Sequence, residues 1–186
     1  MNKIFFIDCE TLSVRDNAVI LSVGMTWITH EDVEKVPSFL ALMKRGFYKK
    51  LNRKEQVAKA RDIQDESLEW WKGQSEEAKR VLKSDNCISF DEFYQCLKNY
   101  LIDNDYDLYS SHLWSKSCKD YYWINTLFND FEAEPLFLHK NVRDSITAWD
   151  LLRGDNIKPI EVNGKIEHNA LHDACDDALK FLQLLK

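Results

Sequence analysis

The sequence predicts an α/β domain in which a mixed sheet is flanked by helices. The first part of the chain holds short apolar runs that are typical of buried strands, and the later part holds apolar residues at helical spacing. Predicted strands and helices are interleaved in the later part, as in sheets that carry helices on their faces. The chain has 186 residues, 45% of them hydrophobic, with no repeat or obvious linker. We therefore expect residues 1–186 to form one domain with a sizeable core.

The first predicted elements are strands. Lys3–Asp8 contains four consecutive apolar residues, which indicates a short buried strand. Ala18–Thr29 is rich in β-branched residues and follows a turn near residues 15–17, so it predicts a second strand. Ser38–Tyr48 is interpreted as a third strand.

The pattern then becomes helical. Glu66–Lys72 predicts a helix that ends at Gly73, and Ser75 is a candidate N-cap for another. Ser89 and Glu92 have the spacing of a capping box, which predicts the start of a longer helix. The apolar stripe of that helix is Phe90, Phe93, Tyr94, Leu97 and Leu101.

The C-terminal half mixes the two kinds of element. Asp107–Trp114 predicts a strand and Lys119–Phe131 a helix. Leu136–His139 is interpreted as a short strand and Arg143–Leu152 as a helix. Asn169–Leu185 closes the chain as a helix with an apolar stripe.

Composition limits the class of protein. No apolar run approaches the length of a membrane span or of a signal-peptide core, so we expect a cytoplasmic protein without membrane contact. The five cysteines include no CxxC pair, which argues against a disulfide framework or a zinc knuckle. The net charge is −6, yet residues 44–61 hold eight Lys or Arg and one acid. This basic strip could attract a polyanion or could simply be a solvated surface.

Two acids follow the first apolar run. Asp8 and Glu10 are separated by one residue, so their side chains project from the same face of a strand. Like charges this close repel each other unless a cation lies between them, and hard oxygen donors suit Mg²⁺ or Mn²⁺. The alternative is a solvated acidic turn at the end of a strand.

A third acid lies on the inward side of a predicted helix. Asp120 is in phase with Ile124, Leu127 and Phe131, which are the core-facing positions. A buried acid requires a partner or a function. The alternative is an exposed acid that compensates the helix N-terminus.

The last helix begins with a histidine and an acid. His168 precedes the predicted N-cap Asn169, and Asp173 lies one turn into the helix. A histidine beside water that is held by a metal is a natural general base. The alternative is an incidental polar helix start, and Asp176 and Asp177 fit that interpretation.

Taken together, these segments resemble the DEDDh family of 3′→5′ exonucleases, which have the ribonuclease H-like fold. The first motif is matched by residues 8–11, and the third by His168 followed at Asp173. The sequence is most similar to the phage exonuclease A group and its bacterial exoribonuclease-like relatives, through residues 8–12, 67–78, 141–144 and 168–173. The second motif is one residue shorter than in that group, because Trp114 lies only six residues before Asp120.

The resemblance implies a two-metal nuclease. Two divalent cations, Mg²⁺ or Mn²⁺, would be held by Asp8, Glu10, Asp120 and Asp173. His168 would act as the general base, and it is preferred to His172 because it fills the motif position. The products would be nucleoside 5′-monophosphates released from the 3′ ends of single-stranded nucleic acid.

Further residues are candidates for substrate binding. The resemblance implies that Thr11 and Leu12 meet the terminal nucleotide, by backbone contact and by apolar wedging. Trp70 and Trp71 could stack on bases or belong to the core, and adjacent helical positions allow at most one of them to point fully inward. Arg143 could orient substrate or pair at a helix start. Related nucleases often dimerise, so a homodimer is possible.

Two other functions remain open. The substrate could be short RNA, because the sugar is recognised by contacts that the sequence does not reveal. A catalytically weak module that binds nucleic acid would fit the shortened second motif. The presence of all four acids and the histidine argues against such a module, since binding alone does not require repelling acids to be kept together.

Overall fold

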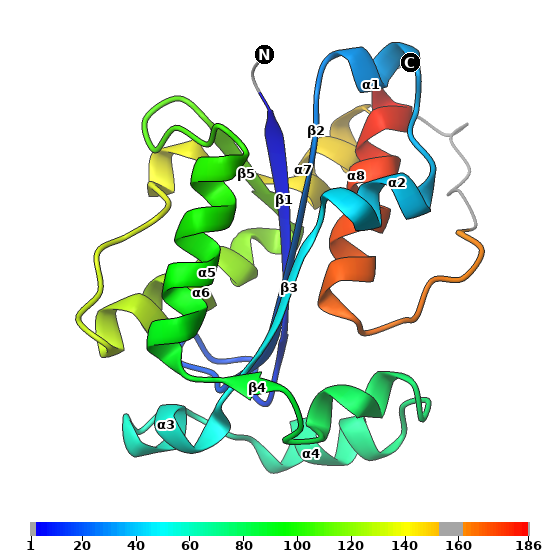
Figure 1. Cartoon of the computed structure of the whole chain (residues 1–186). Helices are drawn as coiled ribbons and strands as arrows, with labels where there is room; N and C mark the ends of the chain where they lie inside the picture. The colour runs from blue at the N-terminus through cyan, green and yellow to red at the C-terminus, as the bar shows by residue number, and fades with distance from the viewer. Residues whose placement is uncertain (1–2, 153–161, 186) are drawn as a thin grey trace.

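The computed structural model describes residues 3–152 and 162–185 and contains a six-stranded mixed sheet (Figure 1). The strand order is β4-β3-β2-β1-β5-β6. β1 is antiparallel to β2 and parallel to β5, which confirms the predicted mixed α/β architecture. The strands are β1 Ile4–Thr11, β2 Ile20–Ile28, β3 Phe47–Leu51, β4 Cys87–Ile88, β5 His112–Ser115 and β6 Val142–Asp144.

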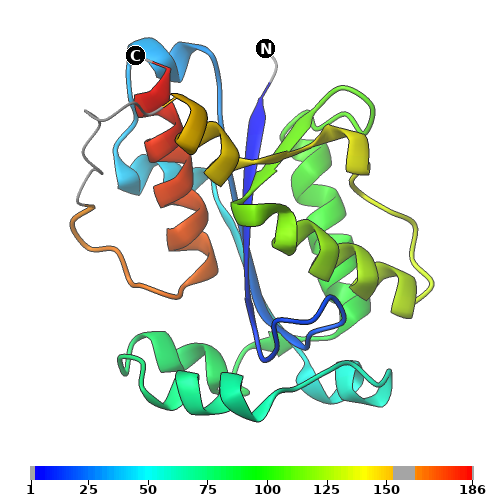
Figure 2. The same cartoon turned by 180° about the vertical axis from the view of Figure 1, so that it is seen from behind.

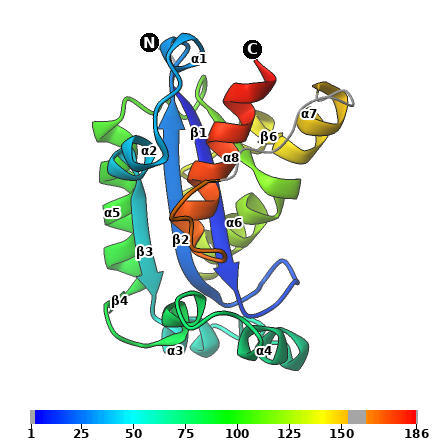
Figure 3. The same cartoon turned by 90° about the vertical axis from the view of Figure 1, so that its right-hand side faces the viewer.

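Helices cover both faces of this sheet, and the views from behind and from the side show the layers (Figures 2 and 3). One face carries α5 (Phe90–Asp103) and α6 (Lys119–Asp130). The other carries α8 (Ala170–Leu184) and α2 (Phe39–Arg45). The remaining helices are α1 Glu31–Glu34, α3 Arg53–Ala58, α4 Asp65–Lys72 and α7 Ser145–Leu152, and the 3₁₀ turns are η1 Ala78–Leu82, η2 Lys116–Cys118 and η3 His139–Asn141. No helix within these described ranges is long and apolar enough to cross a membrane.

The alternation of side chains along β1 separates core from site. Phe5, Ile7 and Cys9 are buried in the core beneath α5 and α6, whereas Phe6 belongs to the core beneath α8. Asp8 is two residues beyond Phe6, so it and Glu10 lie on the α8 side of the sheet. The strand therefore presents its acids to the helix that carries the third motif.

A glycine allows α8 to approach the sheet closely. Gly24 on β2 pairs with Asp8 on β1. A Cβ atom at Gly24 would lie 2.1 Å from the backbone of Ala170 and Leu171, which is too close for any side chain. The first turn of α8 thus rests directly on the sheet beside the acids of β1.

The predicted caps are largely confirmed. The Ser89 hydroxyl accepts a hydrogen bond from the Glu92 amide at the start of α5, and Asn169 caps α8. Gly73 ends α4. The Ser75 hydroxyl accepts from the Ala78 amide, but only the short turn η1 follows.

The prediction of a strand over Ser38–Tyr48 is wrong. Ser38 instead caps α2, through a hydrogen bond from the Ala41 amide to its hydroxyl. The helix ends at Gly46, and β3 begins only at Phe47. A short apolar run such as that in this segment fits a strand or a helix. The Ser38 cap and the burial of Leu42 against α8 favour the helix.

Two further strand predictions need correction. Leu136–His139 is not a strand, because this segment leads into η3. The helix predicted from Arg143 begins only at Ser145, since Val142–Asp144 forms the strand β6. The predicted strand Asp107–Trp114 is extended only from His112, because the Asp107 carboxylate accepts amide hydrogen bonds that form a turn.

Candidate active site

Acidic side chains from β1 and α8 meet around a small cavity. Asp8 and Glu10 reach it from β1, and Asp173 reaches it from the first turn of α8. The cavity has a volume of about 160 Å³. Its lining consists of Asp8, Cys9, Glu10, Lys116, Lys165, Glu167, His168, Asp173, Asp176 and Asp177.

Three of these residues offer a ligand set for a cation. Glu10, His168 and Asp173 place one donor atom each within 4.8 Å of the others. The carboxylate oxygens of Glu10 and Asp173 suit Mg²⁺ or Mn²⁺, and the imidazole of His168 lies beside them. The sequence motif thus assembles in space, although its parts lie some 160 residues apart in the chain.

Asp120 joins this cluster from the opposite side of β1. Asp120 is 3% exposed, and its Oδ1 accepts a hydrogen bond of 2.8 Å from the Cys9 amide. That amide lies beyond the last β1–β5 pair, Ile7 with Ser115. The predicted inward phase of Asp120 is therefore confirmed.

The shortened second motif is accommodated in the connection that precedes α6. Ser117 and Cys118 both adopt left-handed backbone conformations, with φ of 58° and 55°. Two such residues in succession are unusual for side chains with a Cβ. The tight turn lets α6 begin at Lys119, so that Asp120 still reaches β1.

The electrostatics of the acids are those of a site that attracts cations. The pKa of Glu10 is raised to about 8, first by burial and then by the charges of Asp173 and Asp120. Burial raises the pKa of Asp120 to about 7, against the effect of its bond from the Cys9 amide. The pKa of Asp8 is raised well above its usual value by burial and by Asp120 and Glu10. These oxygens fit divalent cations, which would relieve both effects.

The structure adds charged residues that sequence reasoning missed. Asp177 lines the cavity, and burial raises its pKa to about 6. It lies one helical turn beyond Asp173, a spacing that could have identified it. Lys116 and Lys165 also line the cavity and lower the pKa of Glu10. Asp176 is buried and pairs with lysines rather than being an incidental surface acid.

The two histidines of the third segment have different environments. His168 has a φ of 58° just before α8, and its ring packs edge-on against Trp70 with centroids 4.6 Å apart. His172 uses its Nδ1 to accept a hydrogen bond of 2.9 Å from the Ile166 amide. The ring of His172 is thus engaged in structure, whereas His168 lies at the cavity.

A larger groove adjoins the carboxylate cavity. Its volume is about 540 Å³, and it shares Cys9 and Glu10 with the cavity. Trp70 is 47% exposed there, whereas Trp71 is 1% exposed and donates its indole N–H to the Thr11 carbonyl. The expectation that at most one tryptophan points fully inward is confirmed. The groove is lined by Cys9, Glu10, Thr11, Ser13, Val14, Gln64, Glu66, Ser67, Trp70, Trp71 and Trp123.

Two predicted substrate contacts are not at this groove. Leu12 is 2% exposed and packs in a small core with Trp71, so it lies beneath the groove instead of projecting as a wedge. Arg143 Nη1 donates to the carbonyls of Lys140 in η3 and Val142 in β6. It lines neither the groove nor the carboxylate cavity.

The comparisons with known proteins agree with this geometry. A family model described as the 3′-5′ exoribonuclease Rv2179c-like domain matches residues 3–185. The chain belongs to this 3′-5′ exonuclease family. It is 25% identical to the exodeoxyribonuclease of Enterobacteria phage T4, in an alignment 203 positions long that covers 98% of this chain and 88% of that protein.

Solved structures show the same fold in other nucleases. The chain matches the metal-free form of an E. coli ExoI–ssDNA complex with a TM-score of 0.59 and 14% identity. It matches cell-death related nuclease 4 (CRN-4) with a TM-score of 0.50 and 13% identity. The matches cover 100% and 98% of this chain, and the chain spans 41% and 63% of those two proteins. These matches confirm the ribonuclease H-like fold. The resemblance to DEDDh 3′-5′ exonucleases is confirmed by the family model together with the phage relative.

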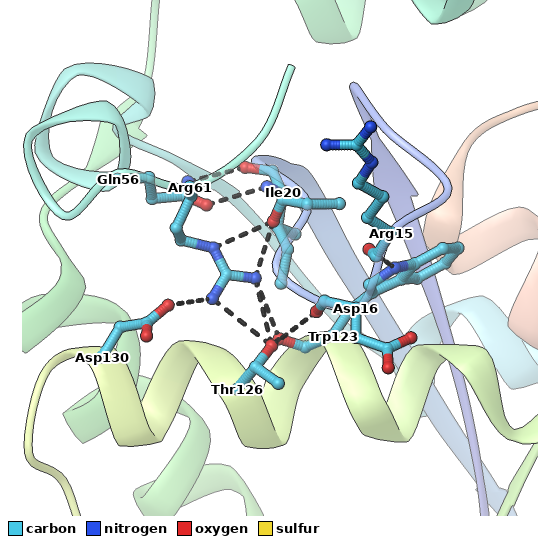
Figure 4. A network of polar contacts seen from close by, with 9 residues as sticks. Arg15, Asp16, Ile20, Gln56, Arg61, Trp123, Thr126 and Asp130 are labelled. Carbon is cyan, nitrogen blue, oxygen red and sulfur yellow. Dashed lines mark hydrogen bonds and ion pairs between the residues drawn. The ribbon is translucent and has the colours of Figure 1, made fainter. Parts of the chain in front are cut away.

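In this exonuclease, a buried arginine fastens one wall of the groove (Figure 4). Arg61 donates from Nε and Nη2 to the carbonyl of Ala18, at 2.9 and 2.6 Å. Its Nη1 donates to the Asp130 carboxylate on α6 at 2.6 Å, and its Nη2 to the Trp123 carbonyl at 3.2 Å. The side chain of Arg61 is fully buried, so it cannot belong to an exposed basic strip.

Two more bonds tie the same loop to α6 (Figure 4). The Thr126 hydroxyl donates to the Asp16 carbonyl at 2.6 Å. The Trp123 indole donates to the Arg15 carbonyl at 2.7 Å. Because this loop follows β1 and contributes Ser13 and Val14 to the groove, the network sets the position of the groove wall.

Proposed function

We propose that this exonuclease uses two divalent cations, Mg²⁺ or Mn²⁺, to hydrolyse single-stranded nucleic acid from its 3′ end to nucleoside 5′-monophosphates. The observation that carries the proposal is that Asp8, Glu10, Asp173 and His168 line one cavity. Asp120 lies close enough for its charge to raise the pKa values of Asp8 and Glu10. Mutual repulsion and burial disfavour the ionised form of these acids, and a bound cation would stabilise it.

The residues would divide the work of phosphodiester hydrolysis. The four carboxylates would hold the cations, which polarise the scissile phosphate and stabilise developing negative charge when bound. His168 would accept the proton of the attacking water, since its ring lies at the cavity and contacts Trp70. Asp120 is kept in place by the Cys9 amide, and Gly24 keeps α8 close to β1.

The groove would hold the last nucleotides of the strand. Its exposed Trp70 offers an aromatic face, and stacking on such faces contributes roughly 1–3 kcal/mol per base without strict sequence preference. Thr11 would contribute backbone contacts, with its carbonyl fixed by Trp71. The groove opens directly beside Glu10, so a strand bound there would bring its terminal phosphodiester to the acids.

We favour DNA as the substrate because the phage relative is an exodeoxyribonuclease and is matched along nearly its whole length. Short RNA is the second candidate, because the matching family is described as exoribonucleases. The two sugars differ by one hydroxyl, which a single contact can distinguish.

We also propose that residues 1–186 act as one domain in the cytoplasm. A homodimer remains a prediction that light scattering can test.

Nucleotide release from single strands labelled at the 3′ end tests the proposal. Matched DNA and RNA oligonucleotides are incubated with Mg²⁺, with Mn²⁺ or with EDTA. We expect stepwise release of 5′-mononucleotides with either metal and none with EDTA. Binding of both strands without release under every condition would instead identify a nucleic-acid-binding module.

A further inference from the structure

The segment that delivers His168 is tied to α8 by an internal ion-pair cluster. Lys165 Nζ lies 2.9 Å from Asp173 Oδ1 and 2.7 Å from Asp176 Oδ2. The Lys165 side chain is 14% exposed and that of Asp176 is 6% exposed, so these pairs are largely shielded from water. Shielded pairs of this kind are screened less by salt than surface pairs. The lysine therefore acts as a fixed cation between the segment and the helix.

A second tie lies one residue further along the chain. The Ile166 amide donates to His172 Nδ1 at 2.9 Å, and the His172 ring packs edge-on against Phe39 of α2. Both ties connect the approach to His168 with the first two turns of α8. On the other side of His168, Asn169 accepts amide hydrogen bonds from α8 and caps it.

His168 is thereby held between two anchored neighbours. Its backbone is left-handed, a conformation that a residue with a side chain adopts only where its surroundings impose it. Its ring contacts Trp70 and, at 6.2 Å between centroids, Trp71. The anchors thus determine where the imidazole lies relative to the acids.

We propose that Lys165 and His172 are positioning residues that hold His168 at the carboxylate cavity before substrate binds. The proposal rests on the role of His168 in the proposed function. Both ties are made by groups of this chain, at Lys165 and at the Ile166 amide. A displacement of about 1 Å in a catalytic group can reduce turnover by as much as 10²-fold, so the anchoring would matter for rate.

Nuclear magnetic resonance of the metal-free protein tests the position directly. We expect a nuclear Overhauser cross-peak between the ring protons of His168 and Trp70 in the parent protein. Lys165→Met should lose this cross-peak, and Lys165→Arg should retain it because a guanidinium can still bridge two carboxylates. Lys180→Met is the matched control, since Lys180 pairs with Asp176 but lies on α8 itself.

Steady-state kinetics on a single-stranded substrate provide the second measurement. Lys165→Met and His172→Ala should each lower kcat on the order of ten-fold or more, with KM changed by less than about two-fold. His172→Asn should recover most of the loss, because its carbonyl oxygen can accept the Ile166 amide. Lys180→Met should keep the parent kcat.

The outcomes separate the two proposals. A persistent His168–Trp70 cross-peak in both Lys165→Met and His172→Ala would overturn the positioning role, whatever the activity. A lowered kcat with the cross-peak retained would show that Lys165 acts directly on substrate or cation, which also overturns it. If the parent protein releases no nucleotide while the cross-peak responds as expected, the proposed nuclease function fails and the anchoring stands.

Discussion

At the scale of single residues, Asp120 is buried against β1 although the second motif is one residue short. We expect Asp120→Asn to lower activity on the order of 10²-fold or more, because an amide supplies no charge to a cation. The fold should persist, since the asparagine carbonyl can still accept the Cys9 amide. Thermal unfolding of the metal-free variant should occur at the parent temperature or higher, because one repelling charge is removed. Asp91→Asn on the exposed first turn of α5 is the control.

Full activity of Asp120→Asn in the nucleotide-release assay would contradict this assignment. The second-motif acid would then have to be sought elsewhere, with Asp177 as the next residue at the cavity. Asp130 cannot replace it, because it lies ten residues along α6 and pairs with Arg61.

Arg61 is the residue that we expect to matter for substrate binding without touching substrate. Arg61→Met leaves the Ala18 and Trp123 carbonyls and Asp130 without their donor. Leaving buried acceptors without their donor destabilises a protein by about 1–3 kcal/mol, which chemical denaturation would measure. KM should rise as well, because the loop that walls the groove loses its tie to α6.

Arg15→Met is the corresponding control, since Arg15 is exposed and pairs with Asp62 at the surface. It should change stability by less than about 1 kcal/mol. If Arg61→Met lowers stability but leaves KM unchanged, the network supports the fold alone and the groove wall is set by other contacts.

Which residues meet at the cavity could be predicted where a motif fixes both residue type and spacing. Asp8, Glu10 and Asp173 could be identified because alternation on a strand and the His168 spacing constrain them. Arg61 could not be identified, because its partners Ala18 and Asp130 come from distant segments. Lys165 could not be identified either, because its pairs with Asp173 and Asp176 form only when the segment before α8 folds back onto the helix. In the sequence Arg61 appears as one of eight basic residues in a strip, and only packing reveals that it is internal.

At the scale of elements, the contact between β2 and α8 brings the third motif to the first. Gly24→Ala should push the start of α8 away from the sheet, because the new methyl group would overlap the backbone of Ala170 and Leu171. We expect a loss of stability of about 1–3 kcal/mol, as for overpacking of a core, with a large loss of activity. Differential scanning calorimetry and the nucleotide-release assay measure the two effects.

Gly73→Ala is the matched control for the same substitution. Its Cβ would lie 3.4 Å from the nearest atom, and Gly73 has an ordinary helical backbone. It should leave stability and activity near those of the parent. Unchanged activity of Gly24→Ala would show that the site does not depend on this close approach.

Elements with strong local signals were predictable, and those that depend on tertiary contacts were not. α5 and α8 carry long apolar stripes with caps, so their periodicity and their starts agree with the structure. Ser38–Tyr48 was misassigned because its local sequence suits strand and helix alike. The short β6 is extended through pairing with β5, and nothing in its own three residues indicates this.

At the scale of the whole molecule, the net charge of −6 gives little indication of a polyanionic substrate. The structure explains how an acidic exonuclease can still bind one. Six of its 31 acids line a single cavity, where cations would reverse the local charge. The basic segment 44–61 is not one free surface, because Arg45 pairs with Asp32 and Arg61 with Asp130.

The same cavity should govern how stability depends on pH. The pKa values of Glu10 and Asp120 are raised to about 8 and about 7, and that of Asp177 to about 6. In the unfolded chain such acids titrate near pH 4. Between about pH 4 and pH 8 the native state therefore binds more protons than the unfolded state, so native stability falls as pH rises through this range.

We expect the metal-free protein to unfold at a progressively lower temperature as the pH is raised from 5 to 8, which differential scanning calorimetry in EDTA would show. Addition of Mn²⁺ at pH 8 should restore the loss, because cations stabilise the ionised acids and bind only the native state. The Asp120→Asn variant should show a weaker pH dependence, since one of the groups with a raised pKa no longer titrates.

Stability that rises from pH 5 to 8 in EDTA would mean that attraction from cationic side chains outweighs the repulsion among these acids. Mn²⁺ would then have little repulsion to relieve, and the carboxylate cavity would not be the cation site that the proposed mechanism requires.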